Sequence, residues 1–258
     1  MQSTGPVSTN SSHPSEVNVV SEAAYTPVSK LSTSIDQPLE QPSLSPTVQP
    51  PYRFRVDSWL SQADALLLLR KRAKREAQQQ NYAAAVQIFN QLIAHEPDRA
   101  DHFGNRGLMH YNLKHYEQAL ADYNRALSIN PEQDQVYNNR ANLHATQQNW
   151  LDALDDYDEA IDINPLNIRA RLNQAVTLRE MGAYDEAITC LDIAMFFRPD
   201  SANLYAERGR SYQLQGHWNC AIADYNRALE LTQQPNESNL EKTDRINKKV
   251  IRWMNSLR

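Results

Sequence analysis

Asparagine recurs at a fixed interval through the middle of the chain. Thirty-four residues separate Asn105 from Asn139, and Asn139 from Asn173. Further asparagines lie beside this column or extend it, at Asn138, Asn142 and Asn203. Each carboxamide offers N–H donors and an oxygen acceptor, which match the groups of an extended peptide backbone. Because asparagine is a poor helix former, its recurrence predicts a peptide-binding ladder, with a tolerated polar surface as the alternative interpretation.

Two groups of cationic side chains accompany the asparagines. The first group predicts an acidic ligand and consists of Arg169, Arg179 and Arg210. The second belongs to a basic run and consists of Arg70, Lys71 and Lys74. This run is interpreted as an anion-binding end of the same surface or as a nuclear localisation signal. The alternative interpretation is a helix whose basic face is exposed to water.

Catalytic and metal-binding patterns are absent from the sequence. The seven histidines form no paired metal motif, and His110 and His144 share one column, which is typical of packing residues. There is no glycine-rich phosphate loop and no Gly-x-Ser-x-Gly motif. Cys190 and Cys220 are too few for a disulfide scaffold and are expected to stay reduced. The sequence therefore predicts a protein that is not an enzyme and holds no metal or cofactor.

Prolines mark the ends of the units that carry these residues. Pro97, Pro131, Pro165 and Pro199 are spaced by 34 residues. A proline cannot continue a helix, so each one predicts a turn. Between the prolines, the spacing of apolar residues is helical.

Small and large apolar residues alternate on one face of each predicted second helix. Ala119, Tyr123 and Ala126 fall at i, i+4 and i+7. The alanines would let a neighbouring helix approach closely, and the ring would fill the remaining gap. The large column at the 34-residue interval is Phe89, Tyr123, Tyr157, Leu191 and Tyr225.

The pattern resembles the tetratricopeptide repeat family, whose unit is a 34-residue helix–turn–helix. In the second unit the match consists of Phe103, Gly107, Ala119, Tyr123, Ala126 and Pro131. Five repeats are expected, at 66–99, 100–133, 134–167, 168–201 and 202–235. The fifth departs from the motif, with Gln233 where proline is expected. The resemblance implies an all-α fold, a right-handed α-solenoid of stacked helix pairs with a concave groove.

The segments outside the repeats have different compositions. Residues 1–52 are rich in Ser, Thr, Pro and Gln, and they are expected to form a disordered tail. Residues 53–65 are expected to form an N-terminal helical extension, with Asp57 or Ser58 as its N-cap. The spacing of apolar residues in 236–258 predicts an amphipathic helix that caps the last repeat. Its apolar stripe is Ile246, Val250, Trp253, Met254 and Leu257.

The resemblance also implies roles for the polar columns. In this family the asparagine column faces the groove, and it is similar to the asparagine ladder in the repeat domain of the O-linked N-acetylglucosamine transferases. Members that capture chaperone tails use Lys, Asn, Asn, Lys and Arg in a carboxylate clamp. The corresponding residues here are Arg70, Lys74, Asn105, Gln135 and Asn139. Because only fragments match, chaperone-tail capture is not expected.

A second pairing recurs within the repeats. Arg106, Arg140 and Arg208 share a column of the first helix. Sixteen residues later come Asp122, Asp156 and Asp224 in the second helix. The fourth repeat has lost both members together, with Gln174 and Cys190, whereas the first keeps Arg72 but has Ile88. This covariation within the chain predicts an Arg–Asp pair that braces the two helices of repeats two, three and five.

Charge and hydropathy limit the partners. The net charge is −5 and the sequence pI is about 5.8, so nucleic acid is not an expected partner. No apolar run approaches the length of a membrane span, and the first residues do not resemble a secretory signal, which predicts a cytoplasmic location. The predicted function is a protein-interaction scaffold or adaptor for an extended peptide or partner protein. The alternative is a peripheral membrane assembly factor that docks through its basic C-terminal helix; the partner and the oligomeric state are open.

Overall fold

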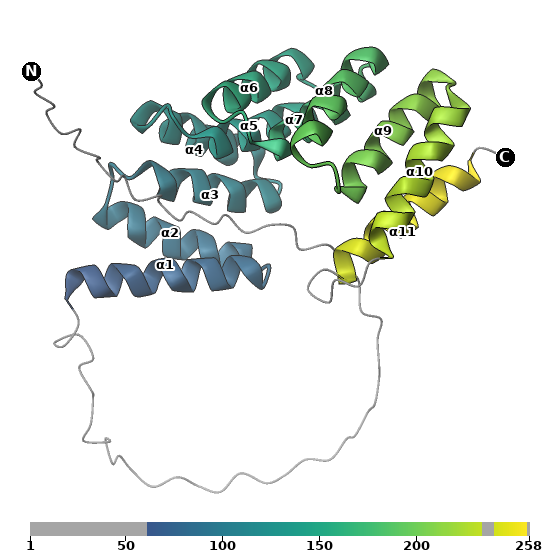
Figure 1. Cartoon of the computed structure of the whole chain (residues 1–258). Coiled ribbons are helices and arrows are strands. Elements are labelled where there is room, and N and C mark those ends of the chain that lie inside the picture. The colour runs from purple at the N-terminus through teal and green to yellow at the C-terminus, as the bar shows by residue number, and fades with distance from the viewer. Residues whose placement is uncertain (1–60, 234–239, 257–258) are drawn as a thin grey trace, which may run out of the picture.

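The computed structural model describes residues 61–233 and 240–256, and within these ranges every regular element is a helix (Figure 1). The predicted tail, most of the predicted N-terminal extension and Leu257 lie outside the described residues. The helices are α1 Gln62–Gln78, α2 Tyr82–His95, α3 Ala100–Asn112, α4 Tyr116–Ile129, α5 Asp134–Thr146, α6 Trp150–Ile163, α7 Ile168–Glu180, α8 Tyr184–Phe197, α9 Ala202–Gln215, α10 Trp218–Thr232 and α11 Leu240–Asn255.

Consecutive helices pack as antiparallel pairs around the small and large columns. Ala119 and Ala126 have no exposed surface, and Tyr123 between them is also fully buried. The ring of Tyr123 is accommodated by Gly107 on α3, where an added Cβ would lie 2.8 Å from the ring. Equivalent alanines and large residues are buried in each of the five pairs, which confirms the packing predicted from the periodicity.

The turn inside each helix pair contains one residue in the left-handed region. Its φ is 62° at Gln80 and Lys114, 63° at Gln148, 85° at Gly182 and 89° at Gly216. These positions are 34 residues apart. A left-handed conformation is sterically free for glycine and costs energy for other residues. The first three turns therefore keep a strained residue that the last two have avoided.

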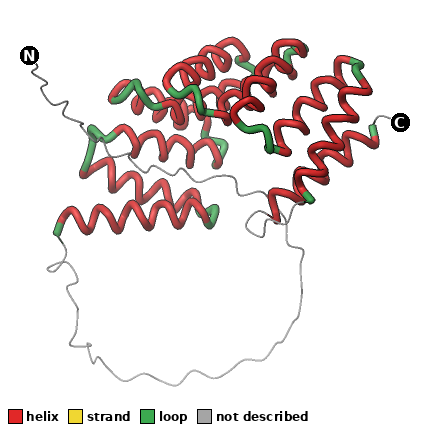
Figure 2. The backbone as a smooth tube through the Cα atoms, viewed as in Figure 1, coloured by secondary structure: helices red, strands yellow, loops and turns green. Residues whose placement is uncertain are grey.

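The helix pairs stack into a curved array (Figure 2). The odd-numbered helices contact each other across successive repeats, from α3 through α5 and α7 to α9, and α9 also contacts α11. Each even-numbered helix packs against its own partner and the first helix of the next pair. The odd-numbered helices thus form one wall, along which side chains from different repeats lie next to each other.

The two ends of the array are closed in different ways. At the start, Ser61 caps α1 by accepting a hydrogen bond from the backbone N–H of Asp64, and the predicted caps Asp57 and Ser58 lie outside the described residues. At the other end, α11 packs on α9 and α10. It buries Ile246 and Val250 against repeat five, as the predicted apolar stripe requires.

Candidate functional site

The asparagine column places its amides on the inner wall formed by α3, α5 and α7. Asn138 is buried, and its Oδ1 accepts a hydrogen bond from Asn173 Nδ2 at 3.1 Å. Its own Nδ2 lies 3.4 Å from Asn139 Oδ1, to which it donates a longer bond. These three amides therefore form a connected chain that joins α5 to α7.

The remaining asparagines differ in whether their side-chain amides form hydrogen bonds within the protein. Asn142 Oδ1 accepts a hydrogen bond from the Tyr157 hydroxyl at 2.7 Å, so this amide supports the core. Asn105 and Asn203 are half-buried, and within the described residues their side chains make no hydrogen bond. Asn105 is consequently the member of the column that is most available to a ligand, and Asn139 keeps its N–H donors.

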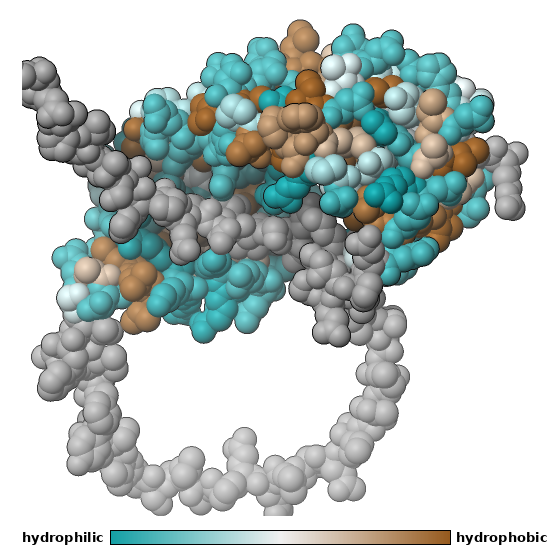
Figure 3. Space-filling view, viewed as in Figure 1, coloured by the Kyte–Doolittle hydropathy of each residue, from teal (hydrophilic) through white to brown (hydrophobic). Residues whose placement is uncertain are grey.

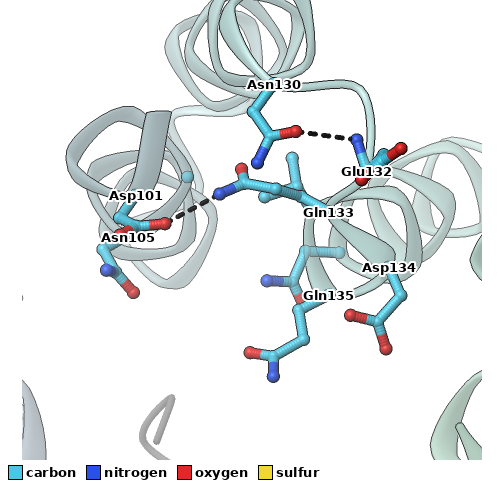
Figure 4. Close-up of a pocket in the computed structure, with 10 residues that line it drawn as sticks. Asp101, Asn105, Asn130, Glu132, Gln133, Asp134 and Gln135 are labelled. Atoms are coloured by element: carbon cyan, nitrogen blue, oxygen red, sulfur yellow. Dashed lines mark hydrogen bonds between the residues drawn. The ribbon is translucent and has the colours of Figure 1, made fainter. Parts of the chain in front are cut away.

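A pocket of 390 Å³ lies between α3 and the turn that joins α4 to α5 (Figure 4). Figure 4 shows Asp101 and Asn105 on one side, facing residues of the turn and of α5 on the other. The lining consists of Asp101, Gly104, Asn105, Asn130, Glu132, Gln133, Asp134, Gln135, Val136 and Asn139. It therefore includes carboxylates and amides but no lysine or arginine.

Hydrogen bonds hold the walls of this pocket in place. Gln133 Nε2 donates to Asp101 Oδ1 at 2.7 Å and so bridges the pocket from the turn to α3. Asn130 Oδ1 accepts from the backbone N–H of Glu132 at 3.0 Å, which fixes the turn after Pro131. Gln133 Oε1 is buried and accepts no hydrogen bond within the described part of the chain.

The arginines that predicted an acidic ligand have different environments. Arg179 is buried, and its guanidinium bonds Glu207 at 2.6 Å, while Lys249 of α11 binds the other oxygen of Glu207. Arg210 donates to Gln213 at 3.0 Å and lies over the ring of Trp253. Arg169 is exposed. An acidic ligand stays a prediction, and Arg169 is the residue of this group that solvent reaches most freely.

The predicted anion-binding run is partly occupied by an internal carboxylate. Arg70 Nη2 lies 2.5 Å from Glu96, and His102 Nε2 lies 2.6 Å from Oε2 of the same residue. Lys71 and Lys74 are exposed. Burial raises the pKa of Glu96, but the hydrogen bonds from His102 and Arg70 outweigh it and lower this pKa from 4.5 to about 2. Glu96 therefore joins Arg70 of the first repeat to His102 of the second, a role the sequence did not reveal.

The Arg–Asp braces of repeats two, three and five are present, as the covariation predicted. The bridged pairs are Arg106 with Asp122, Arg140 with Asp156, and Arg208 with Asp224, each through two hydrogen bonds of 2.6 to 2.8 Å. Each arginine also bonds a residue sixteen positions earlier, on the second helix of the preceding repeat. These third partners are Asn90, Asn124 and Asp192.

Most of the surface in Figure 3 is hydrophilic, with apolar side chains gathered at the start of α1 and over the middle helices. Leu67 and Leu68 are exposed on α1, and Phe196 on α8 is 83% exposed. Among the described residues, no cluster of His, Cys, Asp or Glu is arranged to hold a metal ion. No described helix combines the length and the apolar character that crossing a bilayer requires.

Stacked helix pairs with a 34-residue period and a continuous inner wall define a helical repeat solenoid. Tetratricopeptide repeat models match residues 69–142, 134–167 and 156–189. Together with the small and large residues buried in each of the five helix pairs, these matches support a tetratricopeptide repeat protein. Tetratricopeptide repeat domains generally bind protein partners, which supports a protein-interaction scaffold.

Solved structures of MamA share this fold. The 41-end form from Desulfovibrio magneticus RS-1 is 15% identical, covers 67% of this chain and 98% of its own, and has a TM-score of 0.59. A crystal structure of MamA protein is 14% identical over 67% of this chain and 94% of its own, with a TM-score of 0.56. The structure of MamA MSR-1 is 20% identical, covers 66% of this chain and 98% of its own, and has a TM-score of 0.54. No curated protein matches the sequence at a significant level.

Proposed function

We propose that the inner wall binds an extended segment of a partner protein, mainly through its peptide backbone. The observation that carries this proposal is the row of amides across α3, α5 and α7. Among the described residues no side-chain partner of Asn105 is found, and Asn139 joins the chain that Asn138 and Asn173 complete. Amides spaced along successive helices offer donors and acceptors to an extended backbone, whose side chains would be read only loosely.

The internal bonds of the amide chain support this role because they orient the ligand-facing groups before binding. Asn138 is buried and holds both neighbours, so Asn139 and Asn173 lose little freedom when a peptide arrives. The same bonds separate structural from binding asparagines. Replacing Asn173 would leave the buried oxygen of Asn138 without a donor, whereas replacing Asn105 removes no internal hydrogen bond.

Membrane docking through α11 is the alternative function, and no contact of the helix favours it. Its apolar residues Ile246 and Val250 are already buried against repeat five. Lys249 is bound to Glu207, and Lys248 pairs with Asp244 at 2.5 Å. A bilayer would therefore meet mainly the exposed polar face of the helix.

A test of the proposal begins with a random library of displayed 12-residue peptides, selected against the whole chain. The affinity of the selected peptides is then measured by calorimetry for the Asn105→Ala/Asn139→Ala variant. Two lost hydrogen bonds at about 1 kcal/mol each predict a loss of roughly tenfold or more. Asn219→Ala, at an exposed position of α10, is the matched control. Unchanged affinity in the double variant would refute the proposal.

A further inference from the structure

We propose that the pocket between α3 and the α4–α5 turn receives a lysine or arginine side chain of the bound segment and so sets its register. The inference rests on the proposed binding of an extended segment to the inner wall. Asn105 and Asn139 line the pocket as well as belonging to the amide row. A segment held at these two residues therefore passes directly over the opening.

The charge of the pocket selects the side chain. Three acidic residues line it, Asp101, Glu132 and Asp134, and no lysine or arginine does. Arg99 is the nearby base, with its Nε 3.6 Å from Asp101, and it is also shared with Glu96 at 3.7 Å. The remaining negative charge favours a cation over a neutral or acidic side chain.

The hydrogen bonds within the pocket orient its carboxylates without neutralising them. Asp101 accepts from the amide of Gln133, and Asp134 Oδ2 accepts from Asn164 at 2.8 Å and Asn167 at 2.9 Å. Amide donors carry no net charge, so the carboxylates keep theirs. Asp134 Oδ1 and the carboxylate of Glu132 have no partner among the described residues. Gln133 Oε1 adds a buried acceptor that is also unpaired.

The pocket has the dimensions and acceptors that a long basic side chain requires. Its 390 Å³ exceeds the volume of one lysine or arginine side chain and leaves room for water. An ammonium group carries three donors and a guanidinium five. The carboxylates and the Gln133 oxygen would satisfy several of these donors while the aliphatic stem lies beside Val136.

Comparison of the repeats shows why this pocket would set the register. At the next junction, between α5 and α7, the residues that correspond to Asp101, Glu132 and Asp134 are Gln135, Leu166 and Ile168. The three acids are therefore not repeated there, although the asparagine column is. A backbone ladder alone allows a segment to slide by one residue or more. One charged anchor at one junction would prevent that sliding.

The test uses the same peptide library and the whole chain. Peptides selected on the wild type are expected to share one lysine or arginine at a constant place in the alignment. The Asp101→Asn/Glu132→Gln variant keeps the shape and the acceptor of Asp101 but removes two charges. It should weaken the selected peptides about tenfold, and replacing the basic residue of the peptide by norleucine should cost the wild type a similar factor. Glu159→Gln, exposed on α6, is the control for removing a single carboxylate charge elsewhere on the surface.

The outcomes separate this inference from the function on which it rests. Selected peptides without a shared basic residue, or an unchanged affinity in the double variant, would refute the proposed role of the pocket. Neither result would contradict the proposed role of the amide row. Failure to select any peptide above background would count against the proposed function itself. Glu132→Gln alone, at a side chain that makes no hydrogen bond to another described residue, is measured as well. It should weaken binding in the same direction without altering the thermal unfolding of the chain.

Discussion

Arg140 on α5 and Asp156 on α6 face each other through two parallel hydrogen bonds, from Nε at 2.8 Å and from Nη2 at 2.6 Å. The third nitrogen of the guanidinium, Nη1, donates to Asn124 on α4 at 2.7 Å. One side chain thus joins the two helices of repeat three to the second helix of repeat two. The hydrogen bond with Asp156, aided by its charge, raises the pKa of Arg140.

Breaking this bridge should cost more than breaking a surface ion pair. The Asp156 side chain is only 7% exposed. A double-mutant cycle with Arg140→Gln and Asp156→Asn is expected to give a coupling free energy of about 1–3 kcal/mol in urea unfolding. The cycle Lys248→Gln with Asp244→Asn, at an exposed pair of 2.5 Å, should give a much smaller coupling. Equal couplings for the two pairs would show that Arg140 contributes no bracing.

The strained turn of repeat three offers a stabilising substitution. Gln148 has a φ of 63°, which glycine adopts without penalty. Gln148→Gly is expected to raise the free energy of unfolding by about 0.5–1 kcal/mol. Gly182→Ala is the converse test, because its φ is 85° and no atom lies within 4 Å of an added Cβ. Scanning calorimetry should show opposite shifts in the melting temperature, and two shifts of the same sign would refute the explanation by strain.

The Glu96 cluster should make the first two repeats sensitive to acid. The pKa of Glu96 is lowered from 4.5 to about 2, so its ionised form stabilises the fold above pH 4.5 and this contribution is lost as the pH falls toward 2. Burial lowers the pKa of His102 from 6.5, so the unfolded chain takes up that proton first and loss of stability begins below pH 6.5. Arg70 and Arg99 also face Glu96.

A Glu96→Gln variant isolates the carboxylate from the other groups. It should be less stable than the wild type at neutral pH, since Arg70 and His102 would lose an ionised partner. The difference in unfolding free energy should shrink as the pH falls from 4.5 toward 2, where Glu96 itself becomes protonated. Urea titrations across this range measure it. A difference that stays constant with pH would mean that the lowered pKa does not stabilise the fold.

The packing of α11 predicts a contrast between two adjacent residues. Val250 has no exposed surface, whereas Ile251 is 50% exposed. Val250→Ala should lower the free energy of unfolding by about 1–3 kcal/mol, because it removes two buried methyl groups from the contact with repeat five. Ile251→Ala should change it little. Similar losses at both positions, measured by urea unfolding, would indicate that α11 is not seated as described.

Much of the fold follows from the sequence because its signals are periodic. Tyr123, Tyr157 and Tyr225 recur at one position of the unit, and their burial follows from helical spacing alone. The Arg–Asp bridges were also predictable, since repeats two, three and five have both residues and repeat four has neither, although repeat one keeps Arg72 with Ile88. The turn residues at φ near 62° were not predicted, because Gln80 and Lys114 give no sign of a left-handed backbone.

The candidate site was less accessible from the sequence than the fold. Asn138 was grouped with the ligand-binding asparagines, but it is buried and holds Asn173. Arg179 is occupied by Glu207, a partner 28 residues away on the next first helix. The pocket was not predicted, because its acids come from α3 and from the turn after Pro131. Contacts between such segments depend on how the repeats stack. A set of residues at one position of the 34-residue unit gives no information on that stacking.

The missing bridge of repeat four has a mechanical consequence. Gln174 still reaches back to Asp158 at 2.6 Å, but its contact with Cys190 is a weak 3.5 Å bond in place of an ion pair. The helices α7 and α8 are therefore joined without the Arg–Asp ion pair that links the two helices of repeat three and of repeat five. Under tension along the array, as when a partner pulls on a bound segment, α7 and α8 would separate before the pairs beside them. The scaffold would then behave as two stiffer blocks connected by one compliant repeat.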